Sequence, residues 1–156
     1  MRIGQGFDIH RFSDDISRPL WLGLVEIPGP GLVGHSDADV ATHALCDALL
    51  GAAGLGDLGR HFPDTDPAFA GASSRSLLEH VVALVSHAGY DVANADVTII
   101  AERPRLSALM TQMSEQLSAV VGAPVSVKAT TAEGLGALGA AEGIAALAVA
   151  LIEETR

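Results

Sequence analysis

The order of strand-like and helix-like segments constrains this chain most. Residues 92–101 and 125–130 are rich in β-branched side chains, and residues 106–121 between them carry apolar side chains at helical spacing. Strands that alternate with helices predict a two-layer sandwich of a β-sheet and helices, of the α+β or α/β class.

The first third of the chain continues this alternation. Residues 1–12 predict a strand that enters a functional turn, and residues 20–27 predict a second strand that can form a hairpin with it. Residues 40–53 predict a helix, with Ser36 as its N-cap and Asp39 completing a capping box.

Two later segments complete the pattern. Residues 73–89 predict a helix that begins at a serine and ends at a glycine. Residues 144–152 fit two structures, because their alanines favour a helix but their short length after a glycine-rich loop suits a buried strand. We predict the strand.

Size, charge and hydropathy exclude several classes of protein. A chain of 156 residues, 49% hydrophobic, predicts one domain (residues 1–156) with a real core. A net charge of −10 with nine scattered basic residues argues against a nucleic-acid partner. The longest apolar run is far shorter than the roughly 20 residues of a membrane helix, and no secretory signal is visible, so we expect no membrane partner and a cytoplasmic location.

The single cysteine, Cys46, excludes a disulfide within the chain. We interpret it as a small buried apolar residue and not as a nucleophile.

Three residues from two segments predict a divalent-metal site. Asp8 and His10 are two apart on a predicted strand and therefore share a face. With His43, an acid and two imidazoles leave the fourth corner of a zinc tetrahedron open to polarise a substrate oxygen. Asp39 and Asp47 lie four residues before and after His43 on one helix face, so either could accept the other ring N–H of His43.

Other suggestive residues have plainer interpretations. Two G-x-G-x-x-G segments, residues 54–59 and 134–139, lack the preceding strand or the later acid of a dinucleotide site. His80 and His87 are expected to be solvated or partly buried helix residues, and whether His61 touches a substrate stays open.

Six motifs in register carry a resemblance over nearly the whole chain. They are residues 6–10 (GFDIH), 35–39 (HSDAD), 43–49 (HALCDAL), 56–59 (GDLG), 62–66 (FPDTD) and 128–131 (KATT). Together they resemble the 2-C-methyl-D-erythritol 2,4-cyclodiphosphate synthase family of the non-mevalonate isoprenoid pathway.

The resemblance implies a phosphorus–oxygen lyase. Its small-molecule substrate would be 4-diphosphocytidyl-2-C-methyl-D-erythritol 2-phosphate, whose 2-phosphate attacks the β-phosphorus, closes an eight-membered ring and expels CMP. It also implies an α+β domain that assembles, sheet inward, into a homotrimer with active sites between subunits. Since both reacting groups are anionic phosphates, cations must do most of the electrostatic work.

The resemblance also implies roles for individual residues. Zn²⁺ would bind Asp8, His10 and His43, and a second cation, Mg²⁺ or Mn²⁺, would bind Glu133. His35 and Thr131 match positions that stabilise the transition state. The residues that match substrate-binding positions are Ser36, Asp57, Gly59, Phe62, Asp64, Asp66, Ala101, Pro104, Arg105, Leu106 and Thr130.

Two alanines depart from the family pattern. Many relatives carry an aromatic residue at the position of Ala137 and an arginine at that of Ala140, where they line the central cavity of the trimer. We therefore expect weak or absent anion binding on the trimer axis.

Two alternatives remain at this point. A zinc phosphohydrolase, in which the open position activates water, would release linear products. A non-catalytic, metal-stabilised trimer would show no turnover and would lose its assembly when chelated.

Overall fold

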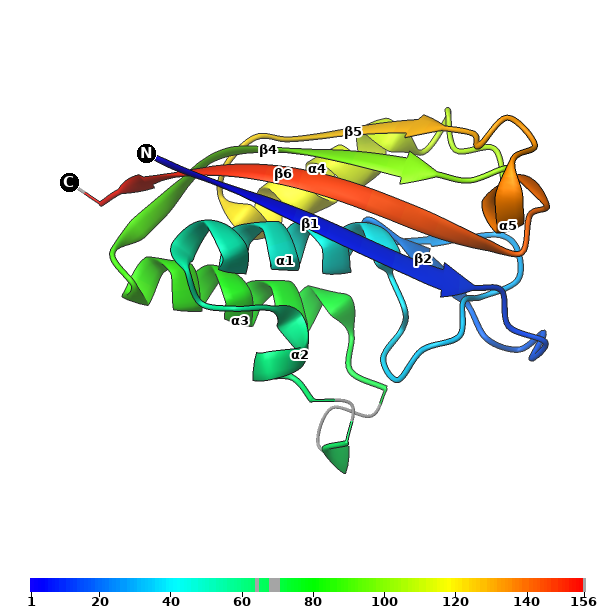
Figure 1. The fold of residues 1–156 in the computed structure, drawn as a ribbon, viewed down its shortest axis with the longest axis horizontal. Coiled ribbons are helices and arrows are strands. Elements are labelled where there is room, and N and C mark those ends of the chain that lie inside the picture. The colour runs from blue at the N-terminus through cyan, green and yellow to red at the C-terminus, as the bar shows by residue number, and fades with distance from the viewer. Residues whose placement is uncertain (64, 68–70, 156) are drawn as a thin grey trace.

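The computed structural model describes residues 1–63, 65–67 and 71–155. Its elements are shown in Figure 1. In chain order they are β1 (Arg2–Arg11), β2 (Leu20–Leu22), β3 (Val25–Ile27), α1 (Val40–Ala53), α2 (Leu58–His61), α3 (Ser74–His87), β4 (Tyr90–Ile100), α4 (Met110–Val121), β5 (Val125–Thr130), α5 (Gly136–Gly139) and β6 (Gly143–Glu154).

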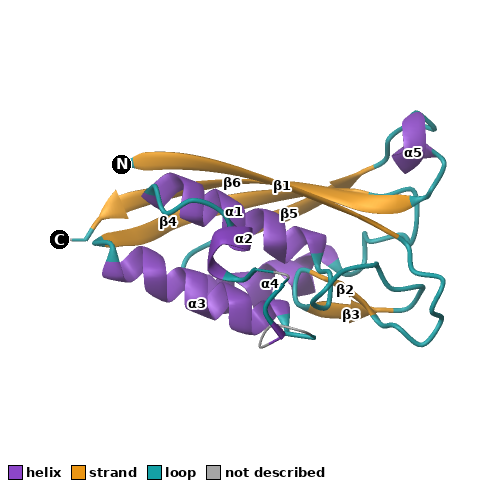
Figure 2. Ribbon diagram, turned by 60° about the horizontal axis from the view of Figure 1, so that its bottom comes forward, coloured by secondary structure: helices purple, strands orange, loops and turns teal. Residues whose placement is uncertain are grey.

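A four-stranded sheet and a layer of helices make the fold. The strand order is β1-β6-β4-β5, with β6 antiparallel to both of its neighbours and β4 parallel to β5. The helices α1, α3 and α4 lie on one side of the sheet (Figure 2). The predicted α+β sandwich is confirmed, and the segment 144–152 is a strand, as predicted.

The second predicted strand does not pair with the first. β1 pairs with β6 along its whole length, whereas residues 20–27 fold on themselves as the hairpin β2–β3. Gly23 and Leu24 both have positive φ, which is the geometry of a tight two-residue hairpin turn. The prediction that residues 20–27 pair with β1 was wrong. Leucine rarely adopts positive φ, so the sequence gives no sign of a turn at Leu24.

Asp39 is the N-cap of α1, and the prediction that Ser36 caps the helix was wrong. The Asp39 carboxylate accepts hydrogen bonds from the backbone N–H and the hydroxyl of Thr42. The same carboxylate accepts the N–H groups of Gly23 and Leu24 at 2.9 and 2.8 Å. This buried carboxylate therefore starts α1 and also fixes the strained hairpin turn.

Backbone contact joins α1 to β1. A Cβ atom at Gly4 would lie 2.0 Å from the carbonyl oxygen of Ala48, and one at Gly6 would lie 1.9 Å from that of Ala44. Non-bonded heavy atoms do not approach so closely, so only glycine at these two positions lets the helix come this near to the strand. The helix ends at Gly54 in the left-handed conformation, and its bounds are those predicted.

The core lies between the sheet and the helices. Cys46 on α1 is fully buried in this core, as predicted, and burial raises the pKa of its thiol well above the ordinary value. No helix in the described part of the chain is both long and apolar enough to cross a membrane.

The sheet face opposite the helices is apolar and exposed. Ile3, Phe7 and Ile9 of β1 and Leu147 and Val149 of β6 are all more than a third exposed. Phe7 and Leu147 are direct cross-strand partners, so these side chains form one continuous patch.

We expect Gly6→Ala to destabilise the fold strongly, because the new methyl group would overlap the Ala44 carbonyl. The expected loss is about 3 kcal/mol or more of unfolding free energy, measured by urea denaturation. Gly51→Ala is the matched control on α1, since its Cβ would meet nothing closer than the Gln5 oxygen at 3.9 Å. It should stabilise the protein by about 0.5–1 kcal/mol, and equal effects of the two substitutions would contradict this packing.

Candidate metal centre and active site

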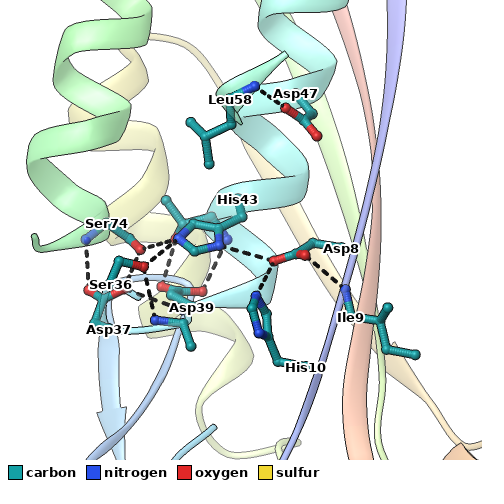
Figure 3. A network of polar contacts seen from close by, with 12 residues as sticks. Asp8, Ile9, His10, Ser36, Asp37, Asp39, His43, Asp47, Leu58 and Ser74 are labelled. Atoms are coloured by element: carbon teal, nitrogen blue, oxygen red, sulfur yellow. Dashed lines mark hydrogen bonds and ion pairs between the residues drawn. The ribbon is translucent and has the colours of Figure 1, made fainter. Parts of the chain in front are cut away.

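Three side chains converge where β1 meets α1. Asp8 and His10 point from β1 toward the helix layer, and His43 points from α1 toward them (Figure 3). Asp8 Oδ2 lies 3.0 Å from His43 Nδ1 and 3.2 Å from His10 Nε2. One ligand atom from each residue lies within 4.8 Å of the others, so the three could hold a single cation.

The backbone fixes which nitrogen of His10 faces the centre. His10 Nδ1 is hydrogen bonded to the carbonyl oxygen of Val33, and an oxygen of this kind can only accept. His10 Nδ1 therefore carries a proton, so in the neutral ring Nε2 presents a lone pair toward the centre, and in the protonated ring Nε2 donates to Asp8.

A buried serine fixes the tautomer of His43 in the same way. Ser74 donates its hydroxyl proton to the Asp37 carboxylate, which also accepts the Ser74 N–H at 2.7 Å. The Ser74 oxygen must then accept the proton of His43 Nε2, 3.0 Å away, while Ser36 Oγ lies at 3.2 Å. His43 Nδ1, which contacts Asp8 (Figure 3), consequently presents a lone pair to it in the neutral ring and donates to it in the protonated ring.

The donor set fits a divalent cation. Two imidazole lone pairs and a carboxylate oxygen face one point, and only positive charge between them removes their mutual repulsion. Burial by itself would raise the pKa of Asp8, but hydrogen bonds and charge from His10 and His43 hold it well below its usual range. The hydrogen bond to Asp8 raises the pKa of His10, against the effect of burial. The centre is therefore built to hold positive charge.

The prediction that Asp39 or Asp47 orients His43 was wrong. Asp39 is used by α1 and the hairpin turn, and Asp47 accepts the Leu58 N–H at 2.7 Å (Figure 3). Burial raises the pKa of Asp47, and the Leu58 N–H opposes this. Ser74 orients His43 instead. It lies 31 residues from His43 in the sequence, so helical spacing could not predict this contact.

A cavity of about 610 Å³ surrounds the metal centre and collects some of the predicted substrate residues. Those lining it, besides the three ligands, are His35, Ser36, Gly59 and Phe62. Asp47 and Leu58 line it too, so the Asp47–Leu58 hydrogen bond helps to hold α2 against the cavity.

Other predicted residues lie elsewhere on this side of the molecule. Asp57 is the N-cap of α2, where it accepts the Arg60 N–H at 2.9 Å. Asp66 donates its backbone N–H to the carbonyl oxygen of Pro63, and Pro63 lines the cavity. Asp64 lies outside the described residues.

His61 and His80 have structural contacts. His61 Nε2 is hydrogen bonded to the Leu55 carbonyl oxygen at 2.9 Å. His80 packs edge-on against Phe62, with ring centroids 5.2 Å apart.

The remaining predicted residues form a second, separate cavity of about 330 Å³. Those lining it are Ala101, Pro104, Arg105, Leu106, Thr130 and Thr131. Within the described chain the two cavities share no lining residue.

Glu133 lies beside this second cavity, away from the three metal ligands. It accepts the Thr131 hydroxyl proton at 2.7 Å, and it is not a member of the His–Asp cluster found among the described residues. Glu102, which sequence reasoning missed, accepts the Ala132 N–H at 2.9 Å and so orients the loop that carries Thr131 and Glu133.

Comparison with known proteins identifies the family. A profile of the YgbB family matches residues 1–153. The chain belongs to this family. It is 58% identical over 156 residues to the 2-C-methyl-D-erythritol 2,4-cyclodiphosphate synthase of Symbiobacterium thermophilum, covering 97% of this chain and 98% of that protein. It is 53% identical to the bifunctional enzyme IspD/IspF of an Anaeromyxobacter species, covering 99% of this chain and 40% of that longer protein.

Solved structures agree with this assignment. A CDP-bound form of 2C-methyl-D-erythritol-2,4-cyclodiphosphate synthase has a TM-score of 0.87 at 39% identity, covering 97% of this chain and all of that one. The CDP complex of IspF from Plasmodium falciparum has a TM-score of 0.86 at 33% identity, covering 99% and 97% of the two chains. The resemblance read from the six motifs is confirmed.

We expect Ser74→Ala to weaken binding of a divalent cation about tenfold or more, because His43 loses the acceptor that fixes its tautomer. Competition with a chelator for Zn²⁺ or Co²⁺ measures this affinity. Ser76→Ala is the matched control in the same turn of α3, since Ser76 Oγ donates to the Ser73 carbonyl. An unchanged affinity in Ser74→Ala would contradict the role of the buried serine.

Proposed function

We propose that this protein is a 2-C-methyl-D-erythritol 2,4-cyclodiphosphate synthase. It would convert 4-diphosphocytidyl-2-C-methyl-D-erythritol 2-phosphate to the 2,4-cyclodiphosphate and release CMP, as a phosphorus–oxygen lyase. The observation that carries the proposal is the Asp8–His10–His43 centre, set in a cavity of a chain that matches such synthases over nearly its whole length.

Zn²⁺ is the cation we propose for the three-residue centre. One carboxylate and two imidazoles suit zinc and leave a coordination position open. When bound, the ion supplies positive charge that offsets the repulsion between two anionic phosphates. The protein's own part is to hold Asp8, His10 and His43 in one tautomeric arrangement before any ligand arrives.

Glu133 is the ligand we propose for a second hard cation, Mg²⁺ or Mn²⁺. Carboxylate, phosphate and water oxygens suit such an ion. Thr131 donates its hydroxyl to Glu133, and Glu102 anchors the loop, so the carboxylate is held in place. We propose that the Thr131 hydroxyl, which has a single proton, turns from Glu133 to the phosphate chain in the transition state.

The cavity around the metal centre would hold the methylerythritol phosphate. His35 is exposed at this cavity and is proposed to donate to phosphate, with Ser36 as a further contact. Gly59 and Phe62 line the same cavity. We propose that Asp57 contacts the substrate hydroxyls and that the segment containing Asp64 and Asp66 covers them.

The second cavity would hold the cytidine nucleotide. Two related structures are CDP complexes. In this chain, the cavity of about 330 Å³ is lined by Ala101, Pro104, Arg105 and Leu106. Arg105 places a positive charge there, and Thr130 lines the same cavity.

A homotrimer would complete the site. The two cavities are separate in one chain, whereas one substrate must reach both the metal centre and the nucleotide cavity. The exposed apolar face of the sheet is a surface suited to burial against other subunits. We therefore propose that three chains, each a single domain of residues 1–156, pack sheet inward and that neighbouring chains share each active site. We also propose that the trimer is located in the cytoplasm.

We expect Phe7→Glu to break the trimer, because it places a charge within the apolar patch on the sheet face. Sedimentation velocity would show the mass fall toward the 16.0 kDa of a single chain. Ile16→Glu is the control, since Ile16 is 95% exposed in the loop after β1. A wild-type mass equal to that of one chain, or a trimeric Phe7→Glu, would refute the proposed assembly.

We expect Asp8→Ala to abolish CMP release through loss of the metal while the fold is retained. The assay uses the authentic substrate with product identification, alongside zinc analysis and circular dichroism. Wild-type protein should yield CMP and the cyclic diphosphate, whereas linear phosphate products would establish a hydrolase and no turnover a non-catalytic trimer. Full zinc content in Asp8→Ala would contradict the ligand assignment.

A further inference from the structure

A third cavity, of about 420 Å³, lies behind the segment that carries His35 and Ser36. Ser36 is the only described residue that lines both this cavity and the one around the metal centre. The other described residues that line it are Arg18, Pro19, Trp21, Leu24, Asp37, Gly71, Ser73 and Arg75. The proposed reaction does not use Arg18, Trp21 or Arg75, which are the basic and aromatic side chains of this cavity.

Two arginines give the cavity positive charge. Arg18 donates through Nη2 to the carbonyl oxygens of Gly34 and Ser36, and Arg75 donates through Nη2 to the Gln116 amide. These partners are neutral, and no carboxylate among the described residues forms an ion pair with either arginine. In a chain of net charge −10, the described lining of this cavity holds two arginines and one acid, Asp37.

One nitrogen of Arg18 is a buried donor without a partner. Arg18 Nε is inaccessible and has no acceptor among the described residues. Buried N–H groups are nearly always hydrogen bonded, so this one calls for an explanation. Because Nε is inaccessible, an anionic oxygen in the cavity would contact the Nη side of the Arg18 guanidinium and would act on the Nε–H only through its charge.

The rest of the lining is suited to a flat apolar body. Trp21 and Leu24 come from the β2–β3 hairpin and Pro19 from the residue before it. Ser73 is the N-cap of the 14-residue helix α3, whose N-terminus adds a field favourable to negative charge. The one acid, Asp37, already accepts hydrogen bonds from Ser74 and from the Asp39 N–H.

We propose that this cavity is a second binding site, for a small organic anion that has a planar apolar body and a sulfonate-, phosphate- or carboxylate-type group. The anionic group contacts Arg75 and Arg18, and the planar body packs against Trp21. The site goes beyond the proposed reaction, and because Arg18 holds the carbonyl groups of Gly34 and Ser36, an occupant contacts the same arginine that positions the His35–Ser36 segment.

Trp21 makes the proposal directly testable, because it is the single tryptophan of the chain. The probe is 4-nitrobenzenesulfonate, a planar anion whose nitro group quenches indole fluorescence on contact. Titration into the intact protein should give saturable quenching and a matching shift of the single indole N–H signal in NMR. The neutral analogue 4-nitrobenzyl alcohol should bind about tenfold more weakly, since it lacks the charge-assisted contacts.

Variants locate the binding. Arg75→Gln should weaken the probe about tenfold, whereas Arg75→Lys should retain most of the affinity because it keeps the charge. Arg2→Gln makes the same charge change beside Tyr90, where Arg2 donates to the tyrosine hydroxyl, and should leave binding unaltered. Circular dichroism verifies the fold of each variant.

The variant Asp8→Asn tests whether the probe binds in this cavity or at the metal centre. Probe binding that persists in Asp8→Asn supports a distinct site, and binding lost with Asp8 assigns the probe to the metal centre and overturns the proposal. Linear, non-saturating quenching, or equal affinity for the sulfonate and the alcohol, overturns it as well. The CMP-release assay is independent of these measurements, so failure here leaves the proposed function standing.

Discussion

The contact between the backbones of β1 and α1 is the constraint on which the rest of the structure depends. Gly4 and Gly6 present no side chain to the helix, and the carbonyl oxygens of Ala44 and Ala48 occupy the space that a Cβ would need. This close approach brings His43 within 3.0 Å of Asp8. A bulkier strand would hold the helix farther from the sheet, and a carboxylate with two imidazoles could no longer share one ion.

The polar groups around this contact form a chain of fixed donors and acceptors. Asp37 orients the Ser74 hydroxyl, Ser74 accepts from His43, and the lone pair of His43 is left facing Asp8. Each step is settled by which atom can only donate or only accept. The geometry of the candidate metal centre is therefore set by two successive hydrogen bonds, from His43 to Ser74 and from Ser74 to the Asp37 carboxylate.

The sequence predicted those features that local periodicity or close spacing specifies. The helices α1 and α3 and the strands β4 and β5 follow from spacing or β-branched runs, and the shared face of Asp8 and His10 follows from strand alternation. The strand β6 was predicted instead from its short length after a glycine-rich loop. It could not reveal that Leu24 adopts positive φ or that Asp39 serves the hairpin turn, since these depend on a contact between segments distant in the chain. Ser74 escaped notice for the same reason, because nothing near it in the sequence marks it as a partner of His43.

The two cavities proposed for the substrate are separate, and the shape of the sheet explains why. Within one chain, the candidate metal centre lies at the contact between β1 and α1, while the cavity proposed for the nucleotide lies past the ends of β4 and β5. β1 and β5 are the opposite edges of the sheet. A substrate that needs both cavities must therefore bridge two edges that no single sheet can bring together, and an apolar sheet face that packs against its copies would place one edge beside the other.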